Sequence, residues 1–167
     1  MKQNWNLLWC TNGGLGLLPK APGTWGSLKP VFAVLVLGHF GSPPALTISI
    51  LLVVVLVSSY ITVNLAKWYE TYFGRKDPPQ VVCDEAAGQS IALLGMAWLE
   101  PHNHVSPQIW VSLAILAFML FRFFDIVKPG PINAAQSLPN GWGVLMDDVF
   151  AGIAAGCIVF FAAALLG

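Results

Sequence analysis

Three long apolar segments constrain the fold of this chain more than any other feature of its sequence. They cover residues 45–66, 108–124 and 149–166 and carry almost no charged side chains. The hydrocarbon core of a bilayer takes about 20 helical residues, so each segment is long enough to enter it. Hydrophobic residues make up 56% of the chain, which exceeds the roughly 45–50% of ordinary soluble domains. These features predict a protein embedded in a membrane.

Two shorter apolar segments, 30–40 and 86–99, would form helices only about 16–21 Å long. They could form short or tilted membrane spans that the longer helices partly cover. We therefore predict an all-α, polytopic helical membrane protein with about five hydrophobic helices, two of them short. These helices would form a single integral-membrane domain over residues 1–167.

Lysine and arginine are confined to alternate connectors between these five segments. Three lysines precede the first segment, three cations lie between the second and third, and two lie around the end of the fourth. The connectors 38–45 and 99–108 contain neither residue. Because short loops rich in Lys and Arg stay in the cytoplasm, the pattern predicts five crossings, with the N-terminus inside and the C-terminus outside.

Five carboxylates fall on the predicted cytoplasmic face, at the membrane boundary. Asp84 and Glu85 precede the third segment, Asp125 ends the fourth, and Asp147 and Asp148 precede the fifth. Carboxylates gathered together repel one another unless a counter-charge is present. Oxygen-only ligands suit Mg²⁺, whereas the histidines that zinc would favour all map to the opposite face. The five acids therefore predict a Mg²⁺ site.

Several cations and a glycine-rich loop lie on the same predicted face. Lys20, Arg122 and Lys128 are placed to hold an anion. Residues 13–27 mix glycine and proline with Thr24 and Ser27, and such a loop can bring backbone N–H groups close to phosphate oxygens. Acids, Mg²⁺ and cations together predict a phosphate-binding site at the level of the lipid headgroups.

Purely structural interpretations of these residues stay open. Acidic pairs before a helix are often N-caps favoured by the helix dipole, and cations at a membrane edge often serve as topology signals and anchors. Capping does not explain Asp125, which would follow its helix, where the dipole disfavours an anion. Gly152 and Gly156, four residues apart in an apolar segment, indicate close helix packing.

Four segments taken together resemble the phosphatidylglycerophosphatase A family. They are "GLGLLPKAPGTWGS" (14–27), "DEAAG" (84–88), "FRFFDIVKPGPI" (121–132) and "GWGVLMDDVFAG" (141–152). The resemblance implies a Mg²⁺-dependent phosphoric monoester hydrolase of the bacterial inner membrane, with its active site facing the cytoplasm. Its phospholipid substrate would be phosphatidylglycerophosphate, which loses its terminal phosphate to give phosphatidylglycerol.

The expected mechanism is an in-line attack on phosphorus by a water that the metal activates. One of the carboxylates would serve as general base, and the sequence does not say which. The expected metal ligands are Asp84, Glu85, Asp125, Asp147 and Asp148. The expected catalytic acids are Asp125, Asp147 and Asp148, and the expected substrate-binding residues are Lys20, Thr24, Ser27, Arg122 and Lys128.

Other chemistries fit the sequence less well. A cysteine phosphatase needs Arg six residues after its Cys, but Gly16 and Gln89 stand six residues after Cys10 and Cys83. An aspartyl-phosphate intermediate stays open, although the usual D-x-D arrangement is absent. Two alternatives of other classes also stay open: a CDP-alcohol-type lipid phosphotransferase, although its D-x-x-D-G-x-x-A-R motif is absent, and a non-enzymatic lipid carrier. The net charge of zero gives no indication of nucleic-acid binding, and no feature predicts an oligomeric state.

Overall fold

The computed structural model describes residues 2–101 and 105–166, which form helices and connecting turns. Within these residues there is no β-strand, only one isolated bridge between Pro101 and Val105. The predicted all-α class is therefore confirmed. The helices are α1 (Lys2–Cys10), α2 (Pro22–His39), α3 (Pro44–Asn64), α4 (Ala66–Phe73), α5 (Cys83–Leu94), α6 (Pro107–Val127), α7 (Pro131–Ala135) and α8 (Gly141–Leu166), with a 3-10 turn over Leu15–Leu17.

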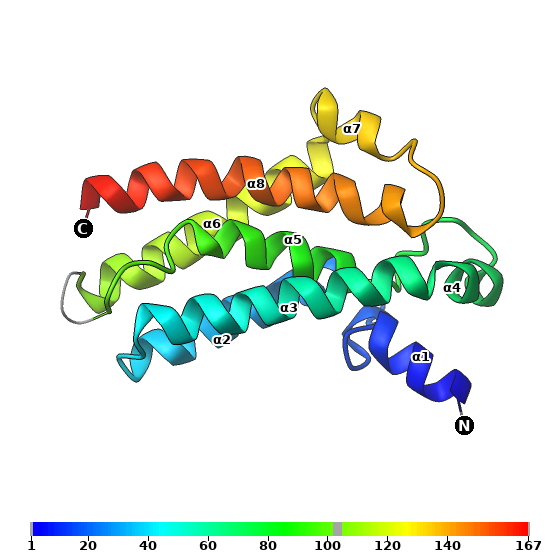
Figure 1. The fold of residues 1–167 in the computed structure, drawn as a ribbon, viewed down its shortest axis with the longest axis horizontal. Coiled ribbons are helices and arrows are strands. Elements are labelled where there is room, and N and C mark those ends of the chain that lie inside the picture. The colour runs from blue at the N-terminus through cyan, green and yellow to red at the C-terminus, as the bar shows by residue number, and fades with distance from the viewer. Residues whose placement is uncertain (1, 102–104, 167) are drawn as a thin grey trace.

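Helices α2, α3, α5, α6 and α8 run along the long axis of the molecule, and the short α1, α4 and α7 lie at one end (Figure 1). The connection between α2 and α3, the connection from α5 to α6 and the C-terminus lie at the opposite end (Figure 1). The two connectors without Lys or Arg therefore share one end of the bundle. This arrangement matches the segregation of charge that the sequence predicts.

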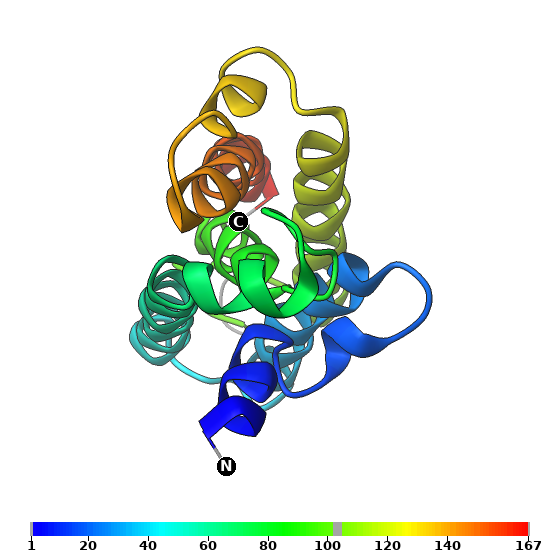
Figure 2. The same cartoon turned by 90° about the vertical axis from the view of Figure 1, so that its right-hand side faces the viewer.

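Helix α5 occupies the centre of the bundle. It packs against α2, α3, α6 and α8, which surround it when the molecule is viewed along its length (Figure 2). Small residues make this position available: a side chain at Gly152 of α8 would overlap the backbone of Gly88 in α5. The predicted packing role of Gly152 is confirmed, and Gly156 likewise faces the α5 backbone at Ile91.

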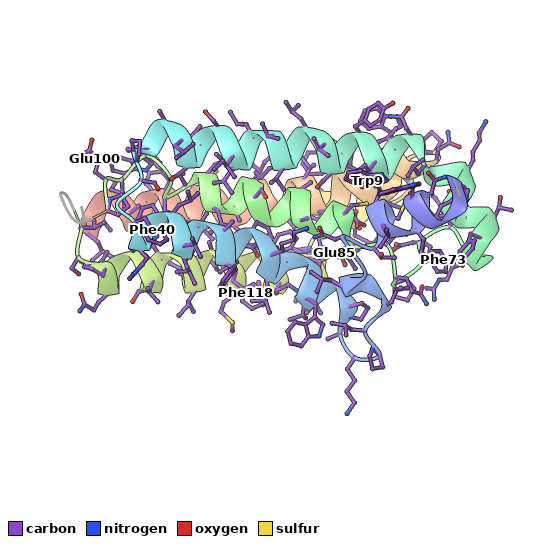
Figure 3. The ribbon with its side chains drawn as sticks, turned by 90° about the horizontal axis from the view of Figure 1, so that it is seen from below. Trp9, Phe40, Phe73, Glu85, Glu100 and Phe118 are labelled. Carbon is purple, nitrogen blue, oxygen red and sulfur yellow. The ribbon has the colours of Figure 1, made fainter. Side chains whose placement is uncertain are left out.

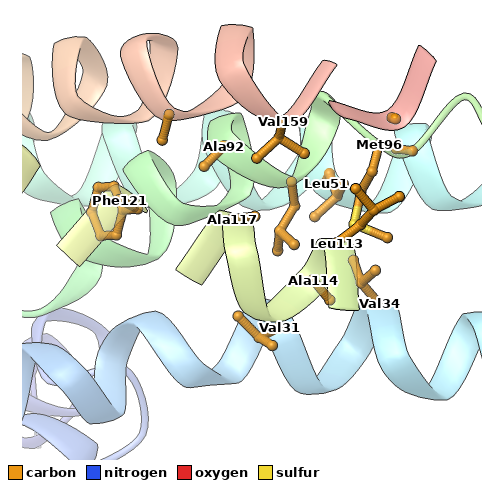
Figure 4. Packing of buried hydrophobic residues seen from close by; sticks show 14 of the residues in the cluster. Val31, Val34, Leu51, Ala92, Met96, Leu113, Ala114, Ala117, Phe121 and Val159 are labelled. Carbon is orange, nitrogen blue, oxygen red and sulfur yellow. The ribbon is translucent and has the colours of Figure 1, made fainter. Parts of the chain in front are cut away.

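The main hydrophobic core fills the space between these helices (Figure 4). Its largest fully buried side chains include Leu51, Leu93, Met96, Leu113 and Phe121, which come from α3, α5 and α6 and from the turn after α5. Alanines on α6 and α8 allow the helices to approach closely around them. This packing fixes the positions of the helix ends relative to one another, including the ends that carry the acidic residues.

Three helices within the described residues are long and apolar enough to cross a membrane: α3, α6 and α8. Five crossings and the sidedness of the bundle stay predictions. The two shorter segments differ from expectation in their limits. Helix α2 begins at Pro22 rather than at residue 30, and α5 covers Cys83–Leu94 rather than 86–99. Proline at the first helical position has a suitable φ and needs no N–H partner, which explains the early start of α2.

Two expectations about helix ends were wrong. Helix α8 begins at Gly141, so Asp147 and Asp148 lie in its second turn rather than before it. Helix α6 continues to Val127, so Asp125 lies inside its last turn rather than after it. The limits of the apolar segments did not predict these helix ends, because polar residues next to an apolar segment can remain helical when tertiary contacts stabilise them.

Candidate active site

Carboxylates from three helices converge at the end of the bundle that carries α1, α4 and α7. Asp84 and Glu85 lie in the first turn of α5, Asp125 in the last turn of α6, and Asp147 and Asp148 in α8. The close contact of α5 with α8 brings two of these groups together, because a side chain at Gly88 would overlap the backbone carbonyl of Asp148. The glycine thus sets the distance between the two acidic turns.

Three of the carboxylates form one compact group, which we call the acid triad: Asp84, Glu85 and Asp148. One carboxylate oxygen from each residue lies within 4.8 Å of the corresponding oxygens of the other two. Asp84 and Asp148 are buried and Glu85 is half-buried; Figure 3 shows Glu85 near the start of α5. Asp84 Oδ1, Glu85 Oε2 and Asp148 Oδ1 are each buried without a hydrogen-bond partner.

Buried polar atoms normally have partners, and leaving them without one costs free energy. Several unpaired carboxylate oxygens in one place suit a hard divalent cation, which prefers oxygen ligands. No side-chain cap closes the start of α5, so N-capping does not account for Asp84 and Glu85. The donor set of the acid triad therefore fits Mg²⁺.

The acids of α5 are electrostatically perturbed. Burial raises the pKa of the Asp84 carboxyl well above its usual value, and repulsion from Glu85 and Asp148 adds to this. Burial also raises the pKa of Glu85 to about 7, although a hydrogen bond with Asp84 opposes the shift. Both directions reflect carboxyls that are buried, so that their charged forms are disfavoured.

The remaining two acids are paired with cations. Arg122 Nη1 lies 2.6 Å from Asp125 Oδ2. Lys128 Nζ lies 2.5 Å from Asp147 Oδ2 and 3.9 Å from Asp125 Oδ1. Asp125 and Asp147 therefore differ from the acid triad, since each has a positive partner and both share Lys128.

Lys128 reaches this position through an unusual backbone conformation. It ends α6 with a φ of 46°, in the left-handed region that non-glycine residues rarely adopt. Its N–H donates to the Phe124 carbonyl at 2.8 Å, which completes the last turn of the helix. The ammonium group then bridges α6 and α8 through Asp125 and Asp147.

Helix α2 contributes two residues from the predicted glycine-rich loop. Ser27 is buried, donates to the Gly23 carbonyl at 2.8 Å and accepts from Arg122 Nη1 at 3.5 Å. A side chain at Gly23 would overlap Glu85 Oε1 and crowd Arg122. The loop interpretation was wrong for residues 22–27, which are helical, but this segment does approach the site.

The structure does not bring every predicted binding residue into the site. The Lys20 side chain is exposed, and its carbonyl accepts a hydrogen bond from Trp25 Nε1. Thr24 is half-buried, and none of the contacts within the described residues joins it to the acids. His39 ends α2 at the opposite end of the bundle, whereas His102 and His104 lie outside the described residues.

Two residues near the site were not predicted. Gln136 donates its amide N–H to Asp147 Oδ2 at 2.9 Å. It also lines a cavity of about 210 Å³ together with Asp77 and Asp147. Gln136 lies in a polar connector with no periodic pattern, so its contact with Asp147 had no signal in the sequence. In the sequence, Asp77 is one acid in a charged connector, and nothing there indicated that it lies near Asp147.

Comparison with known proteins places these residues in a family. Residues 8–163 match the family profile described as Phosphatidylglycerophosphatase A, a range that includes every acid of the site. The chain belongs to the phosphatidylglycerophosphatase A family. This confirms the resemblance that the four sequence segments indicated. No solved structure shows a significant match to the chain.

Curated relatives cover most of the chain. A Haemophilus influenzae protein named phosphatidylglycerophosphatase A is 34% identical over 88% of this chain and 82% of its own length. An Escherichia coli protein of the same name is 29% identical over 96% of this chain and 84% of its own length. A Bacteroides thetaiotaomicron protein named putative phosphatidylinositol-3-phosphatase is 36% identical over 86% of this chain and 84% of its own length.

Proposed function

We propose that this protein is a Mg²⁺-dependent lipid phosphatase that converts phosphatidylglycerophosphate to phosphatidylglycerol. Membership of the phosphatidylglycerophosphatase A family supports the reaction and its substrate. The observation that carries the metal requirement is the acid triad, in which three carboxylates have buried oxygens without partners. Hydrolysis adds water across the terminal P–O bond and releases inorganic phosphate.

Asp84, Glu85 and Asp148 would hold the ion. When bound, a divalent cation neutralises charge on phosphate oxygens and lowers the pKa of water. Arg122 and Lys128 would bind the oxygens of the phosphate groups, since both cations pair with Asp125, and Lys128 also pairs with Asp147, the residue before Asp148. Asp125 and Asp147 hold these cations in place through ion pairs, and they are the further carboxylates available to a second ion or to a proton.

Arg122 is held from two sides. Its nitrogen Nη1 donates to the Asp125 carboxylate, which lies on α6, and to the Ser27 hydroxyl, which lies on α2. A fixed guanidinium stabilises phosphate better than a mobile one, because its orientation does not have to be established during binding. Gly23 leaves room for this arrangement beside Glu85.

A second headgroup deserves direct comparison because one relative has a different name. The similarity to the protein named putative phosphatidylinositol-3-phosphatase favours phosphatidylinositol 3-phosphate as the competing substrate. Both lipids carry a terminal phosphate monoester, so the same residues would serve either reaction. We propose phosphatidylglycerophosphate as the substrate because two relatives and the family carry that name.

We propose a location in the bacterial inner membrane, with the site facing the cytoplasm. Bacterial relatives and three apolar helices support the setting. The orientation rests on the Lys and Arg residues, which are absent from the connectors at the far end of the bundle.

Phosphate release by the detergent-purified protein tests the proposal. Phosphatidylglycerophosphate and phosphatidylinositol 3-phosphate would be supplied in mixed micelles, with EDTA or with added Mg²⁺. We expect release from phosphatidylglycerophosphate that EDTA stops and Mg²⁺ restores. Release that continues in EDTA would contradict the metal requirement. Faster release from the inositol lipid would contradict the assignment of phosphatidylglycerophosphate as the substrate. Asp148→Asn, which changes one acid of the triad, should lose this release, and Glu70→Gln, which changes an acid of α4 outside the site, is its matched control.

A further inference from the structure

A cavity of about 440 Å³ lies between α2 and α3, apart from the acid triad. Both helices pack on α5 but make little contact with each other. Figure 3 shows α5 in the space between them. We call this cavity the α2/α3 groove; its apolar walls and floor include Pro30, Ala33, Val53, Val57, Ile61 and Ala86.

Helix α1 lies across the end of the groove nearest the acids. Trp5, Leu8 and Trp9 line the cavity from this helix, and all three remain exposed. Figure 3 shows Trp9 on α1 beside α3. Tryptophan is enriched where a membrane meets water, because its ring is apolar and its N–H is polar. The groove therefore reaches from the apolar surface of the bundle to the level of the lipid headgroups.

Polar groups occur at this end of the groove. Lys29 Nζ donates to Asn12 Oδ1 at 2.8 Å, and both residues line the cavity. Lys29 has no carboxylate partner among the described residues, and Asn12 Nδ2 is buried without a hydrogen-bond partner. The site thus offers one positive charge and one free donor to an anion.

The groove borders the first turn of α5 at Cys83 and Ala86, but neither Asp84 nor Glu85 lines it. Gly26 of α2 lies so close to Val82 that a side chain there would overlap it. Gly26 lies along α2 between Gly23, which faces Glu85, and Lys29, which lines the groove. A ligand in the groove would not occupy the acid triad.

We infer that the α2/α3 groove binds one acyl chain of an anionic glycerophospholipid from the surrounding membrane, with the lipid phosphate at Lys29. One wall is α3, which is apolar enough to cross a bilayer, so the molecules available to fill the groove are acyl chains. The volume lies within the range of about 300–1,000 Å³ typical of ligand sites. A lysine at headgroup level attracts anionic lipids, which makes this a lipid site distinct from that of the substrate.

Lipid binding to the stripped protein tests this inference. The detergent-purified protein would be washed free of lipid and mixed with phosphatidylglycerol or phosphatidylcholine of identical chains. Bound lipid is then counted by mass spectrometry. Val57→Trp and Ala33→Phe fill the groove from opposite walls. Leu56→Trp is the matched control, because Leu56 is exposed on α3 and does not line the cavity.

We expect the wild type and Leu56→Trp to retain one lipid and both filling variants to lose it, with helical circular dichroism unchanged. We also expect Lys29→Gln to reduce the preference for phosphatidylglycerol by about fivefold, the effect of roughly 1 kcal/mol for one lysine near an anionic headgroup. Lys67→Gln, an exposed lysine of α4, should leave it unchanged. Equal retention in the filling variants, no lipid in the wild type, or a dimer that the filling variants dissociate would overturn the inference.

Discussion

Lys128 at the end of α6 forms an ion pair with Asp147 in the second turn of α8, with Nζ 2.5 Å from Oδ2. The same ammonium group lies 3.9 Å from Asp125 in its own helix. This pair fixes the ends of two apolar helices beside the acid triad. It also distinguishes the two paired acids from Asp84, Glu85 and Asp148, whose unpartnered oxygens are available to a cation.

Asp148→Asn should abolish activity while leaving the protein folded. We expect phosphate release to fall by about 100-fold or more, because even outer partners of a metal ligand cost about 10–100-fold when changed. In EDTA the variant should melt at or above the wild-type temperature, since it removes one of three mutually repelling carboxylates. Phosphate release and thermal unfolding measured on the same preparation check both effects. Near-normal turnover would remove Asp148 from the site.

Gln136→Ala should lower phosphate release by roughly 10-fold, the lower end of the loss found when supporting residues around a metal site are changed. The Gln136 amide donates to Asp147 at 2.9 Å, so its loss frees that carboxylate to turn. Ser137→Ala provides the control, because Ser137 is exposed and its hydroxyl donates to the nearby Ala134 carbonyl, with no other partner among the described residues. Equal rates for the two variants would show that Asp147 needs no support from Gln136.

Gly23→Ala and Thr24→Ala should differ sharply although they are neighbours. The added methyl group at Gly23 would overlap Glu85 Oε1 and crowd the Arg122 guanidinium, so we expect a loss of about 10-fold or more in phosphate release. The Thr24 side chain makes no hydrogen bond to either group among the described residues and is half-buried, so it should tolerate alanine with a rate within about twofold of the wild type. The reverse order of effects would place Thr24, and not Gly23, at the site.

The stability of the metal-free protein should fall as the pH rises. The folded state raises the pKa of Glu85 from 4.5 to about 7, so folding favours its protonated form. That contribution is fully present below pH 4.5 and is lost as the pH rises through about 7. Unfolding temperatures in EDTA should therefore decrease across this interval. Added Mg²⁺ should recover the loss at pH 7.5, and an unfolding temperature in EDTA that rises with pH would contradict this.

The sequence was sufficient to predict the helical class and the gathering of acids at one end. Charge segregation placed Asp84, Glu85 and Asp148 on one face, and the spacing of Gly152 and Gly156 indicated the close packing that brings two of these acids together. Charge placement and glycine spacing both depend on where a residue lies along an apolar helix, and that position can be read from the sequence alone.

Other features depended on contacts between distant segments. Nothing local shows that Lys128 pairs with Asp147 as well as with Asp125, or that Gln136 reaches the same carboxylate. The starts of α2 at Pro22 and of α8 at Gly141 were missed because both first turns are rich in glycine, which lowers helix propensity. Packing of these turns against neighbouring segments overrides that preference.

Calorimetric titration of Mg²⁺ into the detergent-purified protein tests the central claim most directly, with Asp148→Asn and Glu70→Gln measured alongside. We expect saturable binding to the wild type and to Glu70→Gln. We expect binding weakened by at least about 10-fold in Asp148→Asn, the lower end of the loss expected when a metal site is disturbed. Equal affinity in all three proteins, or no binding to a wild type that still releases phosphate, would contradict the assignment of the acid triad as the metal site.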